Sequence, residues 1–223
     1  MRKTIAEHMV RSKQLAPEAW GLVEADVTSL VRLRASLLAD WQRREGFELT
    51  FLPFFIKAVV GSLRESPILN SSWGEDKIIL KKRINVGVAV AVEEGLVVPV
   101  IHDADQKSIA GLAHAVRDLA SRARAGRLGL SDVQGGTFTV NNTGALGSIL
   151  SQPIINQPQA AIITSEAIVK RPVVLPDDAI AIRSMMNVCL TFDHRVLDGA
   201  IALRFLQSVK RRLEAYGPST AIY

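Results

Sequence analysis

Apolar residues recur every three or four positions in five segments of the chain, a spacing that places them on one face of a helix. The predicted helices cover residues 2–13, 28–45, 50–65, 108–124 and 199–215. Thr28 is the expected N-cap of the second helix, because its hydroxyl can accept a backbone N–H of the first turn. Gly46 is the expected stop of the same helix, because glycine readily adopts the left-handed conformation found there.

Shorter runs of apolar or alternating residues predict strands between these helices. They cover residues 19–26, 77–82, 84–92, 96–101, 135–142, 160–169 and 179–192. The run 84–92 is apolar on both faces apart from its glycine, which predicts a central strand buried on both sides. Residues 93–95, Glu-Glu-Gly, are typical of a hairpin turn between this strand and the next.

The pattern contains no composition break, no proline-rich linker and no internal repeat. We therefore predict one α/β domain over residues 1–223, with a mixed, mostly antiparallel central sheet and helices packed against it. The order of the strands does not follow from the pattern. Apolar residues make up 48% of the chain, which is enough for a sizeable core.

Composition bears on whether the chain enters a membrane, is secreted or works in a reducing compartment. No segment approaches the roughly 20 uncharged apolar residues that a membrane helix needs, and the charged start MRKTIAEHMV is not typical of a signal peptide. Cys189 is the single cysteine, which excludes an internal disulfide framework and fits a reducing compartment. Its apolar neighbours predict a raised thiol pKa, so we do not expect it to be a nucleophile.

The net charge of +5 allows nucleic acid, anionic lipid or a phosphorylated small molecule as a partner. No basic run with interleaved aromatic residues is present, and most Lys and Arg residues follow helical patterns that predict solvated faces. We therefore expect no nucleic acid and no membrane partner, and a phosphorylated ligand is the alternative to solvated faces. No HxxxH, HExxH or CxxC spacing occurs, so we also expect no metal site.

The segment TFDHRVLDGA, residues 191–200, contains the histidine with the most suggestive surroundings. His194 lies in a short loop between a predicted strand and a predicted helix, a place where side chains rest on a rigid base. Asp198 can cap the helix and also act as an electrostatic partner. The residues alone leave two interpretations open: a proton-transfer histidine, or a capped helix with a surface His–Asp pair.

Several segments, in order, carry a resemblance to a known family. They are RKTIAEHMVRSK, NVGVAVAVEEGLVVPVI, GGTFTVNNTGALGS, IINQPQAAI, VKRPVV and the His-Arg-x-x-Asp-Gly motif at His194. The chain resembles the catalytic domain of the dihydrolipoamide acyltransferases of 2-oxo acid dehydrogenase complexes, most closely the branched-chain type. The resemblance implies a chloramphenicol acetyltransferase-like α/β fold that is a trimer building block. The lipoyl and peripheral-subunit-binding domains of such proteins are expected to be absent from residues 1–223.

The resemblance implies transfer of an acyl group between dihydrolipoamide and coenzyme A, with coenzyme A as a substrate. The lipoyl group would come from a lipoyl domain that this chain lacks. A thiol with a pKa of about 8.5 is mostly protonated at neutral pH, so a base must remove its proton. By resemblance, His194 is that base, and Asp198 holds the site together by ionic or hydrogen-bond contact. Arg2 and Arg195 are the two candidates for the cationic partner of Asp198.

One position departs from the acetyl- and succinyl-transferring relatives, which have a serine or threonine hydroxyl to stabilise the oxyanion. Here Asn141 occupies that place, and its NH2 can donate to an oxyanion. The alternative is that Asn141 and Asn142 satisfy the backbone of a tight turn, with Thr143 as a weaker donor.

Arg11 and Ser12 match an Arg-Ser pair that relatives use for the nucleotide end of coenzyme A. A guanidinium and a hydroxyl suit a phosphate. The alternative is that the two residues are simply an exposed helix end.

The resemblance further implies a homotrimer that assembles into a 24-mer cube or a 60-mer. It would work with decarboxylase and dihydrolipoamide dehydrogenase subunits, in the cytoplasm or in a mitochondrial matrix. Two other functions stay open: a catalytically silent scaffold core, and a free-standing small-molecule acetyltransferase.

Overall fold

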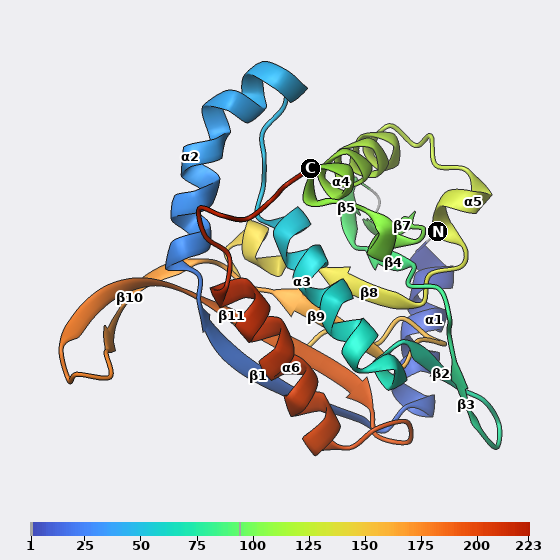
Figure 1. The fold of residues 1–223 in the computed structure, drawn as a ribbon. Coiled ribbons are helices and arrows are strands. Elements are labelled where there is room, and N and C mark those ends of the chain that lie inside the picture. The colour runs from blue at the N-terminus through green and yellow to red at the C-terminus, as the bar shows by residue number, and fades with distance from the viewer. Residues whose placement is uncertain (1, 94) are drawn as a thin grey trace.

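Strand β11 (Ile180–Asp193) is the longest strand of the main sheet in the computed structural model (Figure 1). The structure describes residues 2–93 and 95–223, without the side chains of Arg2 and Thr4. The helices are α1 (Arg2–Leu15), α2 (Thr28–Glu45), α3 (Leu52–Glu65), α4 (Ile109–Arg124), α5 (Leu130–Val133) and α6 (Gly199–Glu214). The other strands are β1 (Glu18–Asp26), β2 (Ser71–Trp73), β3 (Ile78–Leu80), β4 (Val86–Val88), β5 (Val90–Val92), β6 (Gly95–Val97), β7 (Val100–Ile101), β8 (Phe138–Asn141), β9 (Ala161–Ser165) and β10 (Val169–Val174).

Within the described residues, seven strands form the main sheet in the order β1-β11-β9-β8-β4-β7, and β10 also pairs with β11. β8 runs parallel to both β9 and β4, and the other pairs are antiparallel. The prediction of a mixed, mostly antiparallel sheet is therefore confirmed. The pairs β2–β3 and β5–β6 stand outside this sheet.

Helices cover the sheet as their apolar stripes predict. α6 lies along β1 and β11 and packs against α3, which in turn packs against α4 (Figure 1). The buried residues of α6 include Phe205, Leu206, Val209 and Leu213. Burial of one such side chain stabilises a fold by about 1.5–3 kcal/mol, so this stripe fixes α6, and with it the loop before it, against the sheet.

The two-stranded arm formed by β10 and the first part of β11 extends away from the rest of the chain (Figure 1). One face of this arm carries exposed apolar side chains: Val174, Ile180 and Ile182 are 69%, 75% and 73% exposed. Apolar side chains clustered on a projecting arm are typical of a protein–protein contact.

Five helices and four strands agree with their predicted segments, including the Gly46 stop, where φ is 73°. The predicted N-cap was wrong by one residue. Val27 is the N-cap of α2, and Thr28 is the first helical residue. The Thr28 hydroxyl donates to Asp26 and accepts the N–H of Ser184, so it joins α2 to two strands of the sheet instead of capping the helix.

The prediction of one continuous strand over residues 84–92 was wrong. The run divides into β4 and β5, which belong to different sheets, and the N–H of Ala89 donates to Val140 of β8 between them. The run 96–101 divides in the same way into β6 and β7 around Pro99, which has no N–H for a ladder. β5 and β6 pair as the predicted hairpin, whose turn includes Glu94, outside the described residues.

The predicted strand 160–169 also divides, because β9 ends at Ser165 and β10 begins at Val169. The N–H of Ala167 turns away to donate to Ser148 in the β8–β9 connection. Among the described residues, no helix is both long and apolar enough to cross a membrane.

Candidate active site

His194 stands at the end of β11, in the turn that leads into α6. Its backbone N–H donates to the carbonyl oxygen of Pro17 at 3.0 Å, which ties the turn to the end of α1. Its side chain is exposed, with the ring centroid 5.8 Å from that of Phe192. No hydrogen bond joins the imidazole to another described residue, so both ring nitrogens are open to a ligand.

Asp193 and Arg195 clamp the turn on either side of His194. The Asp193 carboxylate is buried and accepts from Arg195 Nη2 at 2.7 Å, from Arg195 Nε and from the Arg195 backbone N–H. The Asp193 bond raises the pKa of the Arg195 guanidinium, which also lies 5.3 Å from the ring centroid of Trp73. Sequence reasoning left Asp193 outside the site, although it fixes the backbone that presents His194.

Asp198 is the N-cap of α6, as predicted. Its Oδ1 accepts the backbone N–H of Ile201 at 2.9 Å, an interaction worth about 0.5–2 kcal/mol. No hydrogen bond connects Asp198 to His194 among the described side chains. Of the two candidate cationic partners, Arg195 is paired with Asp193 instead, and the side chain of Arg2 lies outside the described residues.

Asn141 ends β8, and Asn142 begins the turn that follows. The Asn142 N–H donates to Asn141 Oδ1 at 2.9 Å, and Asn142 Oδ1 accepts the N–H of Ala145. Both carbonyl oxygens therefore support the backbone of the turn. The first bond also fixes the orientation of the Asn141 amide, so its NH2 points away from the Asn142 N–H and has no partner among the described residues.

Thr143, the weaker candidate for an oxyanion donor, has its hydroxyl committed elsewhere. Thr143 Oγ1 donates to Glu166 Oε2 at 2.8 Å. Glu166 is 2% exposed, and sequence reasoning did not single it out. The sequence feature that could have identified Glu166 is its place in the apolar run AAIITSEAIV, because a charged residue in a buried strand needs hydrogen-bond or ionic partners.

The sheet places Asn141 and His194 far apart within one chain. Asn141 is paired with Thr164 of β9, and Thr164 is paired with Cys189 of β11. His194 lies five residues beyond Cys189, roughly 16 Å along the strand direction and roughly 10 Å across the sheet from Asn141. A single chain therefore does not bring the two residues together.

Arg11 and Ser12 lie near the C-terminal end of α1, and the carbonyl oxygen of Ser12 accepts the N–H of Ala16, the residue before Pro17. Arg11 is exposed, and no ion pair joins it to a described residue. Ser12 is fully buried, and its hydroxyl donates to the carbonyl oxygen of Ile155 at 2.6 Å. In this chain, Arg11 is open to a ligand while the Ser12 hydroxyl is part of the fold.

Cys189 is fully buried in β11, and burial raises the pKa of its thiol, which confirms the prediction from its apolar neighbours. An inaccessible thiol with a raised pKa is a poor nucleophile.

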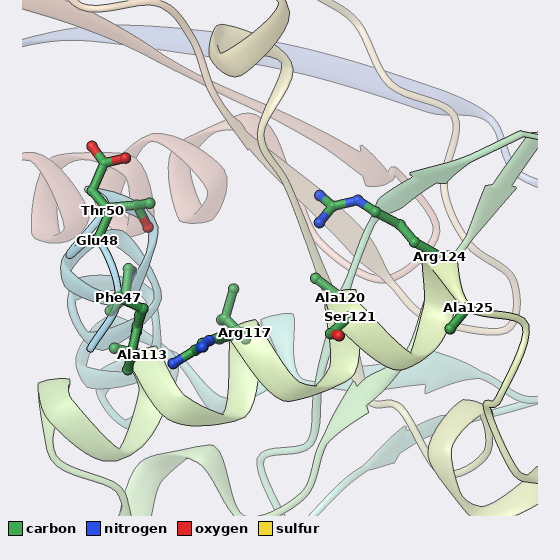
Figure 2. Close-up of a pocket in the computed structure, with 11 residues that line it drawn as sticks. Phe47, Glu48, Thr50, Ala113, Arg117, Ala120, Ser121, Arg124 and Ala125 are labelled. Carbon is green, nitrogen blue, oxygen red and sulfur yellow. The ribbon is translucent and has the colours of Figure 1, made fainter. Parts of the chain in front are cut away.

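Of two cavities in the structure, one lies away from the residues described above and the other is partly lined by them. A cavity of about 680 Å³ lies between residues 47–53 and α4, where Figure 2 shows Arg117 and Arg124 on one helix, and it includes none of the predicted site residues. A second cavity, of about 430 Å³, is lined by Asn142, Glu166 and apolar side chains of α2 and α3. The turn after β8 thus forms a wall of this second cavity.

A family model and similar known sequences indicate one family of proteins for this chain. The sequence model of the 2-oxoacid dehydrogenases acyltransferase (catalytic domain) matches residues 1–221. The lipoamide acyltransferase component of the branched-chain alpha-keto acid dehydrogenase complex of Bacillus subtilis is 52% identical over the whole chain. The dihydrolipoyllysine-residue acetyltransferase component of the pyruvate dehydrogenase complex of Mycobacterium bovis is 44% identical over 96% of the chain. The chain spans 53% and 40% of the lengths of these two relatives.

Solved structures agree with this result. A probable dihydrolipoamide acetyltransferase from Listeria monocytogenes is 52% identical, with a TM-score of 0.97 over 100% of this chain and 95% of that one. The Azotobacter vinelandii dihydrolipoamide acetyltransferase is 34% identical, with a TM-score of 0.92 over 96% of this chain and 88% of that one. A chloramphenicol acetyltransferase is 13% identical with a TM-score of 0.56, which confirms the predicted fold alone. The chain therefore belongs to the family of 2-oxoacid dehydrogenase acyltransferases, whose catalytic domain matches its residues 1–221.

Proposed function

We propose that the protein transfers an acyl group between dihydrolipoamide and coenzyme A, as the core of a 2-oxo acid dehydrogenase complex of the branched-chain type. The observation that carries this proposal is the exposed imidazole of His194, held by the Asp193–Arg195 clamp. It stands in a chain that is 52% identical to a lipoamide acyltransferase component. Residues 1–223 would be the catalytic domain of the protein.

In the proposed reaction, His194 removes the proton from the coenzyme A thiol, and the resulting thiolate attacks the carbonyl carbon of the lipoyl thioester. The tetrahedral intermediate collapses with loss of the lipoyl sulfur, which takes the proton back from His194. No acyl-enzyme forms, so the burial of Cys189 is no obstacle. Asp198 contributes by fixing the start of α6 immediately after the His194 turn.

The Asn141 NH2 is proposed to donate to the oxyanion of that intermediate. The structural study of the Azotobacter vinelandii enzyme names a serine, a histidine and an asparagine, the last four positions after the histidine, in its catalytic mechanism. In the present chain, the position four residues after His194 is Asp198, and the serine's role falls to Asn141. The Asn141 NH2, which has no hydrogen-bond partner in the described part of the chain, supports this assignment.

The proposed site is formed between two chains, because one chain separates His194 from Asn141. The turn after β8 supports a contact there, since Leu146, Ile149 and Leu150 are exposed on its outer side. We propose a homotrimer that assembles into a cubic 24-mer, with a 60-mer as the alternative. A relative that is 35% identical forms the cubic core of a pyruvate dehydrogenase complex. Lipoyl domains, the decarboxylase and dihydrolipoamide dehydrogenase would be the partners of this core.

Arg11 is proposed to contact a phosphate of coenzyme A, with Ser12 holding the helix end in place through Ile155. The free thiol of Cys189 supports a reducing compartment, which is the cytoplasm or a mitochondrial matrix.

The proposed activity predicts a graded response to acyl donors. Incubation with dihydrolipoamide and acetyl-, isobutyryl- or succinyl-coenzyme A should give thioester product, with the highest kcat/KM for isobutyryl-coenzyme A. Formation of S-acyl dihydrolipoamide, followed by mass spectrometry, measures the transfer. Failure of all three donors would favour the silent scaffold. Transfer to chloramphenicol but not to dihydrolipoamide would favour the free-standing acetyltransferase.

The apolar face of the β10–β11 arm predicts an effect on assembly. Replacing both Ile180 and Ile182 with aspartate should yield particles of lower mass, because a charged face cannot be buried against a second chain. Sedimentation velocity measures the mass distribution. Lys170→Ser, an exposed polar position on the same arm, is the control and should leave the mass unchanged. An unchanged mass for the Ile180/Ile182 variant would show that the arm is not at an interface.

A further inference from the structure

Glu166 is a buried carboxylate that has no cationic partner among the residues that the structure describes. It is 2% exposed, and none of the ion pairs among the described residues includes it. Three hydroxyls donate to it instead: Thr143 at 2.8 Å to one oxygen, and Thr164 at 2.9 Å and Ser151 to the other. A buried charge is costly unless such donors satisfy it, so this arrangement needs an explanation beyond core packing.

These three hydroxyls surround the segment that carries Asn141. Thr164 is the direct partner of Asn141 in the β8–β9 pairing, and Thr143 lies two residues after it. Ser151 lies near the middle of the connection between the two strands, which covers residues 142–160. The carboxylate therefore joins the start and the middle of the β8–β9 connection to the strand beside Asn141.

The residues on either side of Glu166, Ser165 and Ala167, also form hydrogen bonds with the β8–β9 connection. The N–H of Ala167 donates to the Ser148 carbonyl oxygen at 2.7 Å, and the Ser165 hydroxyl lies 3.3 Å from Asn142 Oδ1. Gly144 packs so closely on this segment that an added Cβ would lie 2.2 Å from the carbonyl carbon of Glu166. The turn and the Glu166 segment thus form one closely packed unit.

We propose that Glu166 is a positioning residue for acyl transfer: its carboxylate fixes the Asn141–Asn142 turn so that the Asn141 NH2 faces the oxyanion. This inference rests on the proposed acyl transfer and on the donor role of Asn141. Both of its oxygens accept from hydroxyls, so the role assigned to Glu166 is to hold the turn and not to bind the substrate. A donor must lie within a few tenths of an ångström of its productive place, so the rigidity of the turn bears directly on the rate.

The ionisation state of Glu166 suits this role. Burial works to raise its pKa, but the hydrogen bonds from Ser151, Thr143 and Thr164 bring the pKa below the ordinary value. The group is therefore ionised at neutral pH and accepts from all of its donors. A glutamine in its place would put an NH2 where one carboxylate oxygen now accepts, so the hydroxyl or hydroxyls on that side would lose their acceptor.

The test compares Glu166→Gln and Glu166→Asp with the wild type. For Glu166→Gln we expect kcat to fall on the order of tenfold, KM for both substrates to stay within about twofold, and the particle mass to be unchanged. Amide hydrogen exchange over residues 142–151 should be faster. Glu166→Asp keeps the charge and should give an intermediate kcat.

Glu65→Gln is the matched control, because Glu65 also accepts from a serine hydroxyl, that of Ser208, but between α3 and α6. It should leave kcat and the exchange of residues 142–151 unchanged. If Glu166→Gln retains kcat within about twofold of wild type, or leaves that exchange unchanged, the positioning role is refuted. If the wild type transfers no acyl group, the proposed function fails separately, and the exchange result still decides whether Glu166 holds the turn.

Discussion

Replacing His194 with alanine is expected to lower kcat for acyl transfer by about 10²- to 10⁴-fold, the range that general acid–base catalysis typically contributes. The reason is that coenzyme A would then have to lose its thiol proton to water. KM for coenzyme A should change little, because the exposed imidazole is not part of the proposed phosphate contact. Steady-state kinetics with coenzyme A and S-isobutyryl-dihydrolipoamide, the direction in which the coenzyme A thiol attacks, measure both values.

The control for this variant is His102→Ala. His102 is also exposed, and its Nε2 lies 3.1 Å from the carbonyl oxygen of Ser131 in α5. Its loss should leave kcat unchanged. A His194→Ala protein with more than about half of the wild-type kcat would remove His194 from the mechanism and restore the interpretation of a surface histidine beside a capped helix.

The strand, turn and helix around His194 show which features of the site could be predicted from the sequence. The long apolar run before it predicted the strand, the Asp198 cap predicted the start of α6, and both are confirmed. These features are local, because a strand period and a cap depend on residues only a few positions apart. The Asp193–Arg195 clamp is local as well, but its signal, an acid two positions before an arginine, is too common to have been distinctive.

Other features depend on contacts between distant segments, and the sequence pattern does not contain them. The run 84–92 looks like one buried strand, yet its first part, β4, pairs with β7 and β8, and its last part, β5, pairs with β6 in another sheet. Likewise, the partners of Glu166 come from residues 143–164, so its role is visible only after β8 and β9 are paired. The separation of His194 from Asn141 follows from the strand order, which periodicity could not give.

Asn141→Ala is the second large effect expected. Loss of one oxyanion donor typically lowers kcat by about 10²- to 10³-fold, or about 2.7–4 kcal/mol. Asn141→Ser keeps a hydroxyl donor of the kind found in the acetyl- and succinyl-transferring relatives and should retain more activity than the alanine variant. An alanine variant with unchanged kcat would show that Asn141 only supports its turn through the Asn142 N–H.

Mixed assemblies of the two alanine variants test whether His194 and Asn141 act across an interface. If each site takes His194 from one chain and Asn141 from its neighbour, a site is intact only when a His194-bearing chain meets an Asn141-bearing chain in the right order. In a ring of identical interfaces with equal amounts of the two variants, the chain on the first side of a site carries His194 with a probability of about one half. The chain on the other side carries Asn141 with the same probability, so random co-assembly gives about one intact site in four. Co-expressed His194→Ala and Asn141→Ala chains should therefore recover about a quarter of wild-type kcat, while either variant alone stays nearly inactive. If both residues of a site came from the same chain, every site would carry a lesion and mixing would restore nothing, so recovered activity would place the reaction between subunits.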